Sequence, residues 1–284
     1  MSAPTGVASP FGRREPACEP GRCEEPSVPA LVLGALLRYH RERAGMSPAA
    51  AGAVIRKSAS TISRLECAQV PARRHDVLDL ARAYGLRGHA LDEAEELLDH
   101  GHQHLLAGLY GPPHAVLAVL KARATHLRIL TVFELPTVAG IVAGTTHPAP
   151  AATPGRTVSR PQADHRDVTL LVEDTVLRRP RGGYAAAAAR LRQTIDLAEH
   201  GAWTVRIVPH ERRTCPIGPL ISELVLPQGR VYVHEGHLPV YRTGRPAAPY
   251  RTALDAAADA ALNREASLQA LREAAHAFSL REAA

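Results

Sequence analysis

The sequence predicts a mainly α-helical protein whose C-terminal part is an α+β domain, and two patterns carry this prediction. Between residues 30 and 100, apolar residues recur every three or four positions in five consecutive segments, which is typical of amphipathic helices. Beyond residue 164, short apolar or alternating runs are bounded by Gly, Pro and charged residues, which is typical of strands. We therefore expect five short helices, followed by a domain that mixes helices with antiparallel strands.

Composition is consistent with two folded domains behind an N-terminal arm. The chain has 284 residues, of which 45% are hydrophobic, so it is long enough to bury two cores. The first 29 residues are rich in Pro, Gly, Ser and charge and have little to bury. The predicted divisions are a disordered arm over 1–29, a helical domain over 30–100, a helical connector over 101–128, and an α+β domain over 129–284 with a Pro/Ala-rich loop at 146–164.

The first predicted helix covers Leu31–Arg43, and the second follows Ser47 at once. Serine is a favoured N-cap, and Pro48 has the φ angle that the first helical position needs. The residues that follow are small, and Gly52 among them would let another helix cross closely. A short second helix is therefore expected, in close contact with its neighbour.

The third predicted helix begins after Ser58, so that two short helices are joined by a tight turn. Ile62 and Leu65 are three residues apart and can both face inward. This leaves small residues and one arginine facing outward, namely Ala59, Ser60, Thr61, Ser63 and Arg64. The pattern is typical of a helix-turn-helix, whose second helix enters the major groove of DNA by its N-terminal end.

Two more helices complete the predicted domain, over Arg74–Tyr84 and Leu91–Leu98. Charge is concentrated in the same region. Residues 31–90 contain ten Lys or Arg and four acidic residues, so this segment carries as much net charge, +6, as the whole chain. A charge-rich stretch can be a merely solvated face, but around a groove-reading pattern it favours a phosphate-binding surface.

Four motifs of this domain resemble those of the lambda Cro/cI (XRE) family of DNA-binding domains. They are Leu36-Leu37-Arg38, Ala44-Gly45-Met46-Ser47, Tyr84-Gly85-Leu86 and, most specifically, Ser58-Ala59-Ser60-Thr61-Ile62-Ser63-Arg64-Leu65-Glu66. The resemblance implies that the base-reading positions are Ala59, Ser60 and Arg64. Arg64 would read a guanine edge, while the methyl group of Ala59 offers only apolar contact, for example to a thymine methyl.

The DNA backbone would be held by hydroxyl and basic side chains around the same helix. The residues assigned to this role are Arg38, Lys57, Thr61, Ser63, Arg73 and Arg74. The chain departs from the XRE pattern at Arg56, which stands in the turn where Gly is usual. We therefore expect a non-glycine residue at positive φ there.

In the C-terminal part, helices are predicted over Ala115–Arg128 and Tyr184–His200, and over Tyr250–Phe278 with a break near Asn263. Strands are predicted over Val168–Val172, Thr204–Val208, Leu220–Leu226 and Val231–His234. The last two flank Pro227-Gln228-Gly229-Arg230, which indicates a hairpin.

This part is similar to a domain found behind XRE domains in many actinobacterial regulators. The similar segments are Val132-Phe133-Glu134 with Val138-Ala139-Gly140, Glu173–Pro180 followed by Gly182-Gly183, and Val205-Arg206-Ile207-Val208-Pro209. The resemblance implies a transcriptional regulator, in some members paired with a small neighbour-encoded protein in an antitoxin-like system. The charged residues Glu173, Asp174, Arg178 and Arg179 are read as a stabilising cluster or as a partner surface.

No catalytic pattern is recognised, and we expect no enzyme and no cofactor. Glu173 and Asp174 are adjacent and would diverge on a strand, and neither a Gly-x-Ser-x-Gly elbow nor a Walker loop is present. His100, His102 and His104 raise a metal site as an alternative, but Gly101 weakens the helix that would align them, and surface histidines are favoured. With no apolar run long enough to span a membrane, a cytoplasmic protein is expected.

The sequence thus predicts a transcriptional regulator that binds double-stranded DNA through the helix at about 58–66, with activity controlled through the C-terminal domain. A homodimer is expected because one such helix reads only half a site. The C-terminal domain would bind a small neighbour-encoded protein or a small ligand. The alternative function is an antitoxin-like interaction module that binds a partner protein rather than DNA.

Overall fold

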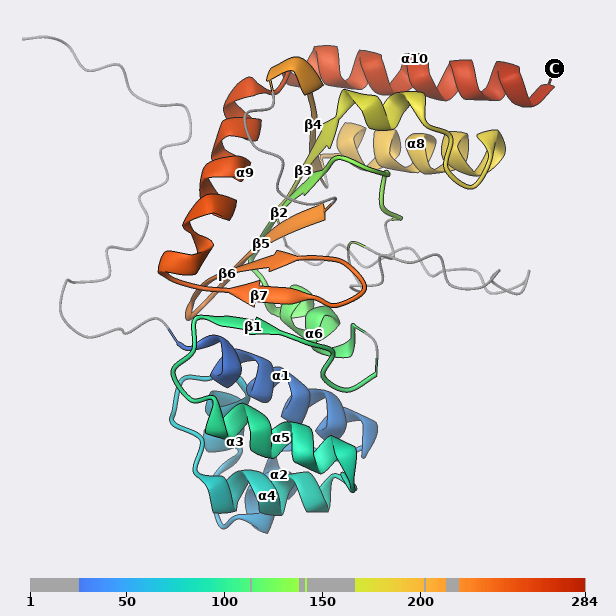
Figure 1. Ribbon diagram of the computed structural model, residues 1–284. Coiled ribbons are helices and arrows are strands. Elements are labelled where there is room, and N and C mark those ends of the chain that lie inside the picture. The colour runs from blue at the N-terminus through green and yellow to red at the C-terminus, as the bar shows by residue number, and fades with distance from the viewer. Residues whose placement is uncertain are drawn as a thin grey trace, which may run out of the picture.

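The computed structural model describes residues 26–112, 114–137, 141, 167–201, 203–212 and 220–283. Residues 1–25 of the arm expected over 1–29, and the loop expected at 146–164, lie outside these residues, whereas Val28 and Pro29 are buried in the first helix and do not belong to a disordered arm. Figure 1 shows the helical domain at the lower end of the molecule, beneath a sheet that is flanked by further helices. The predicted combination of a helical domain and an α+β domain is confirmed.

Five helices form the N-terminal domain, as predicted. They are α1 (Val28–Arg43), α2 (Pro48–Val54), α3 (Ala59–Glu66), α4 (Arg74–Ala83) and α5 (His89–Asp99). The serine caps explain three of the starts, because Ser27, Ser47 and Ser58 each accept a hydrogen bond from the backbone N–H three residues later. Apolar side chains of all five helices meet in one buried core.

The strands among the described residues form one seven-stranded sheet in the order β1-β7-β6-β5-β2-β3-β4. Their bounds are β1 (Leu105–Ala107), β2 (His126–Thr131), β3 (Asp167–Glu173), β4 (Trp203–Val208), β5 (Leu220–Leu226), β6 (Gly229–His234) and β7 (Val240–Arg242). The hairpin is confirmed, since β5 and β6 pair antiparallel with Leu226 opposite Gly229. The sheet is mixed rather than antiparallel throughout, because β2, β3 and β4 run parallel.

The segment expected as a helical connector, 101–128, contains one helix, and strands lie on both sides of it. Helix α6 (Ala115–Arg123) ends five residues earlier than predicted, and β2 begins at His126. Strand β1 lies before the helix and pairs with β7, more than 130 residues later in the chain. The apolar residues Leu127 and Ile129 continue the helical pattern of the sequence, but they point into the sheet core.

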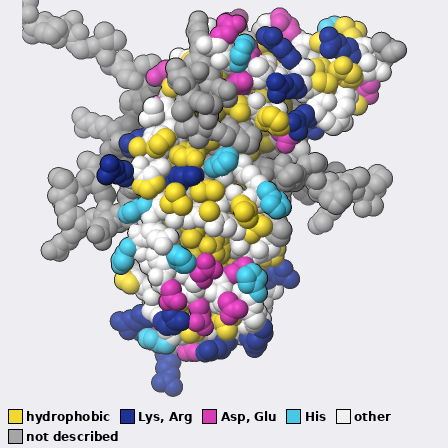
Figure 2. All heavy atoms as spheres, in the orientation of Figure 1, with side chains coloured by type: hydrophobic (Ala, Val, Ile, Leu, Met, Phe, Trp, Pro, Cys, Tyr) yellow, Lys and Arg dark blue, Asp and Glu magenta, His cyan; other side chains and the backbone are white. Residues whose placement is uncertain are grey.

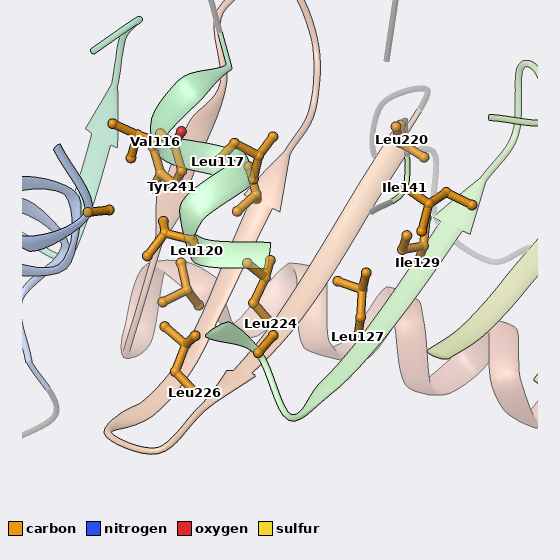
Figure 3. Packing of buried hydrophobic residues seen from close by; sticks show 14 of the residues in the cluster. Val116, Leu117, Leu120, Leu127, Ile129, Ile141, Leu220, Leu224, Leu226 and Tyr241 are labelled. Atoms are coloured by element: carbon orange, nitrogen blue, oxygen red, sulfur yellow. The ribbon is translucent and has the colours of Figure 1, made fainter. Parts of the chain in front are cut away.

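Helices cover both faces of the sheet (Figure 1). On one face lie α6, α8 (Tyr184–Glu199) and α10 (Arg264–Ala283), whose apolar side chains share the core of the N-terminal domain. Figure 3 shows Leu117 and Leu120 of α6 against Leu224 of β5 within this core. On the other face, α9 (Ala248–Ala260) packs in a second cluster, and the break predicted near Asn263 separates it from α10.

Helix α6 is tied to the sheet by a buried ion pair as well as by apolar contacts. The Nζ atom of Lys121 lies 2.7 Å from Oε1 of Glu235, which follows β6, and both side chains are almost wholly buried. Ser222 on β5 donates a hydrogen bond to the same carboxylate. Breaking one partner of such a pair would leave an uncompensated buried charge, so α6 is held firmly on the sheet.

Two non-glycine residues with positive φ flank α3. Arg56, in the turn before the helix, has a φ of 54°, as the sequence predicts, and Ala68, just after the helix, has the same value. Left-handed backbone costs a residue with a Cβ about 1–2 kcal/mol relative to glycine. The chain therefore carries local strain on both sides of this helix.

Replacing Arg56 by glycine is expected to stabilise the protein. The side chain is exposed, so the variant loses little packing and relieves the strained φ angle. We expect Arg56→Gly to raise the free energy of unfolding by about 1 kcal/mol in denaturant titrations. The control is Ala277→Gly at an exposed position inside α10, which should lower the free energy by about 1 kcal/mol. Equal losses in both variants would contradict the strain at Arg56.

Candidate nucleic-acid interface

Helix α3 packs against the N-terminal domain through apolar side chains on one side, and its other side is exposed. Ile62 is fully buried and Leu65 nearly so, as the sequence predicts, and both belong to the core of the N-terminal domain. Ala59, Ser60 and Arg64 are exposed together on the opposite side. The structure therefore brings the three predicted base-reading residues onto one surface of one helix.

The turn before α3 is close-packed against α2. A Cβ atom added at Gly52 would lie 2.4 Å from the carbonyl oxygen of Lys57, so only glycine fits there. The backbone N–H of Lys57 donates a 2.8 Å hydrogen bond to the carbonyl oxygen of Gly52. Gly52 does mark a close approach, but the group that approaches is the backbone of the turn and not the crossing helix that the sequence predicts.

The hydroxyl groups at the start of α3 already have local partners. The Oγ atom of Ser58 accepts a hydrogen bond from the N–H of Thr61 and lies 3.0 Å from Thr61 Oγ1. Ser63 donates a hydrogen bond to the carbonyl oxygen of Ala59 at 3.2 Å. A phosphate oxygen needs a donor, so Ser63 would have to exchange its internal hydrogen bond for one to DNA, whereas one proton of the Ser58–Thr61 hydroxyl pair is not used between them.

The predicted DNA-contacting cations fall into two groups. Arg38 donates to Glu42 at 2.7 Å, and Arg74 lies 2.6 Å from both Glu95 and Asp99 of α5. Within the described residues, Lys57, Arg64 and Arg73 are exposed and take part in no ion pair. Of the predicted DNA-contacting cations, those available to an external anion are therefore Lys57 in the turn, Arg64 in α3 and Arg73 in the loop after α3.

Figure 2 shows where charge gathers on one face of the molecule. Lys and Arg side chains surround its lower end, over the N-terminal domain, while Asp and Glu side chains cluster on the same face just above. The acidic residues of α5 include Glu95 and Asp99, which neutralise Arg74. On this face, the lower end of the N-terminal domain is therefore basic, and an acidic area lies next to it.

The C-terminal end of α3 is fixed by a buried ion pair that the sequence analysis did not identify. The carboxylate of Glu66 accepts two hydrogen bonds from Arg41 of α1, at 2.6 Å and 3.0 Å, and both residues are buried. Arg41 also donates to the carbonyl oxygen of Met46 at 2.9 Å. The side chain of Glu66 accordingly raises the pKa of Arg41. One signal was available: Glu66 lies one residue beyond Leu65, near the buried side of the helix.

Helix α1 passes close to the same end of α3. A Cβ atom added at Gly34 would lie 2.4 Å from the carbonyl oxygen of Glu66, so the absence of a side chain sets how closely the two helices approach. Gly34 lies among the buried apolar residues of α1. This close contact positions α3 at a fixed depth against the domain.

Of the four charged residues proposed as a stabilising cluster or partner surface, Asp174 and Arg178 form an ion pair, while Glu173 is buried. Glu173 ends β3 and is buried, where it accepts a hydrogen bond from Thr175 at 2.7 Å. Asp174 accepts a hydrogen bond from the N–H of His210 and lies 3.6 Å from Arg178. Arg178 and Arg179 are exposed, so only the two arginines are open to a partner.

The histidines at 100–104 do not share a helix face. Helix α5 ends at Asp99, His100 contacts the carbonyl oxygen of Glu96, and His104 lies 3.0 Å from the hydroxyl of Thr243. In the described part of the chain, His, Cys, Asp and Glu form no group of three or more that could hold a metal ion. None of the helices in the described part of the chain has the length and apolarity needed to span a membrane.

Two family models match the chain. One is described as a helix-turn-helix domain and matches residues 32–94, and the other, a domain of unknown function (DUF5753), matches residues 151–273. The first confirms the predicted helix-turn-helix, with α3 as its second helix. None of the curated proteins matches the chain.

One solved structure that matches is TrmBL2, described as an archaeal chromatin protein with a novel mode of DNA binding. It shares 12% sequence identity with this chain, and the TM-score is 0.30. The match covers 66% of this chain, which spans only 60% of the length of the TrmBL2 chain. A TM-score this low supports no conclusion about fold or function.

The contact between α1 and α3 predicts a steric effect at Gly34. Gly34→Ala forces Cβ against a backbone oxygen, so we expect the free energy of unfolding to fall by about 1–3 kcal/mol in denaturant titrations. The control is Gly236→Ala, whose Cβ would meet nothing within 4 Å and whose change should stay within about 0.5 kcal/mol. A Gly34→Ala variant as stable as its control would show that the helices do not meet so closely.

Proposed function

We propose that this protein is a sequence-specific DNA-binding transcriptional regulator that inserts α3 into the major groove. The observation that carries the proposal is the exposed surface of α3, with Arg64 unpaired among the described residues, inside a domain that matches a helix-turn-helix model. An exposed arginine on a helix that fits the groove is suited to the O6 and N7 atoms of guanine. The proposal assigns no catalytic step to the chain.

The assigned roles follow the two groups of cations. Arg64 and Ser60 read base edges, and Ala59 lies against the groove floor with only its methyl group to offer. Lys57 and Arg73 hold phosphates, because they are exposed and lie just before and just after α3. Arg38 and Arg74 contribute less, since each would have to leave a carboxylate partner first.

A homodimer is part of the proposal. With one arginine and one serine as its polar base contacts, a single copy of α3 discriminates weakly between DNA sequences. Two copies on two half-sites would double the number of base contacts. The C-terminal domain is suited to control DNA binding, because its core is continuous with that of the N-terminal domain. A ligand or small protein bound there would affect α3 through the packed helices between them. An actinobacterial-type, antitoxin-like relationship to such a partner belongs to the same proposal.

Removing the guanidinium of Arg64 should cost specific affinity. We expect Arg64→Ala to weaken binding to a selected duplex by about 1–3 kcal/mol and to relax the preference at one base position. The measurement is selection of binding sites from a random duplex pool with each protein, followed by titration. If both proteins select the same base at every position, the assigned register of α3 is wrong.

Removing the charge of Lys57 should weaken binding to all DNA duplexes to the same extent. We expect Lys57→Ala to reduce the slope of log K against log salt by about one, with no change in the selected sequence. The matched control is Arg74→Ala, which removes the same charge from a residue already paired with Glu95 and Asp99. A larger loss of affinity in Arg74→Ala than in Lys57→Ala would contradict the division of the cations.

A further inference from the structure

The last residue of α6 touches the last residue of α3. The Nη1 atom of Arg123 donates a hydrogen bond of 2.6 Å to the backbone carbonyl oxygen of Glu66. Carbonyl groups in the last turn of a helix have no partner within the helix. Here the N–H groups of Ala68 and Gln69 donate hydrogen bonds to the carbonyl oxygens of Leu65 and Arg64, respectively. Arg123 donates to the carbonyl oxygen of Glu66.

The environment of Arg123 makes this contact strong and specific. The side chain is half-buried, and burial lowers the pKa of its guanidinium, which still remains charged because an arginine pKa starts so high. A positive charge at the C-terminal end of a helix is stabilised by the helix dipole. The Nη2 atom is buried and has no hydrogen-bond partner among the described residues, so the Glu66 carbonyl is the contact that holds the group.

Helix α6 lies between the sheet and α1 of the N-terminal domain, and it packs against both. Lys121, two residues before Arg123, is paired with Glu235 in the sheet core, and Leu117 and Leu120 pack on β5 (Figure 3). On its other side, α6 packs along α1. Because α6 is tied to the sheet, a displacement of the sheet relative to the N-terminal domain would carry Arg123 with it and act on the end of α3.

We propose that Arg123 is a positioning residue through which the C-terminal domain sets the orientation of α3 on DNA. The inference rests on the proposed function and adds a route for its control. The Nη1 atom of Arg123 is bonded to the Glu66 carbonyl oxygen, and its Nη2 atom is buried inside the protein. The guanidinium is therefore engaged within the protein, where it acts by holding the C-terminal end of α3.

The first test compares DNA binding by full-length variants. The probe is a duplex that the unmodified chain selects from a random pool. We expect Arg123→Gln to weaken binding about tenfold, as for the loss of a hydrogen bond to a charged group, while the salt slope stays unchanged. Arg123→Lys should recover most of the affinity, because the ammonium group keeps the charge and a donor. The control Arg281→Gln removes the same charge from exposed α10 and should bind normally.

Two outcomes of this test would overturn the inference. A salt slope reduced by about one in Arg123→Gln would mean that Arg123 contacts a phosphate directly. Unchanged affinity and unchanged base preference in the same variant would mean that the contact does not position α3.

A second readout needs no DNA and separates this inference from the proposed function. We expect Arg123→Gln to accelerate hydrogen exchange at the amides of Cys67, Ala68 and Gln69 by about tenfold, because these close the end of α3. Amides of β3, on the far side of the sheet, should exchange as before. Equal acceleration in β3, or none at 67–69, would overturn the positioning role. If the unmodified chain selects no duplex while the exchange result holds, the proposed function fails and the coupling of α6 to α3 stands.

Discussion

The placement of α3 depends on a single residue, Glu66, at its C-terminal end. The carboxylate is held by Arg41 of α1 through two short hydrogen bonds, and the carbonyl oxygen is held by Arg123 of α6. Gly34 lets α1 approach the same carbonyl without a side chain between them. With one end fixed in this way, the N-terminal half of α3 is left exposed at the surface, where a groove-reading helix needs it.

This anchoring explains why few side chains suffice for the proposed interface. Ala59 offers a methyl group, and the hydroxyls of Thr61 and Ser63 are already engaged, so Arg64 and Ser60 provide the sequence-dependent contacts. Two of the expected phosphate-binding arginines are engaged within the domain. An interface with so few contacts depends strongly on the exact orientation of its helix, and in this structure α1 and α6 both bond to the last residue of that helix.

The sequence predicts the helix-turn-helix well because its signals are local. Serine caps, Gly52, the spacing of Ile62 and Leu65 and the positive φ of Arg56 act within a few residues of one another. Pairings distant in the chain were missed: β1 with β7, the parallel strands β2–β4, and the end of α6, where the apolar pattern continues from helix to strand. The ion pairs that occupy Arg74 and that fix Glu66 were missed for the same reason, because their partners lie more than twenty residues away.

The central claim, that Arg64 reads guanine in the major groove, is tested most directly by methylation interference. Methyl groups placed on guanine N7 of a selected duplex lie in the major groove and block an arginine that binds there. The account predicts one guanine in each half-site whose methylation prevents binding by the unmodified chain but no longer affects Arg64→Ala. An identical interference pattern for both proteins would contradict it.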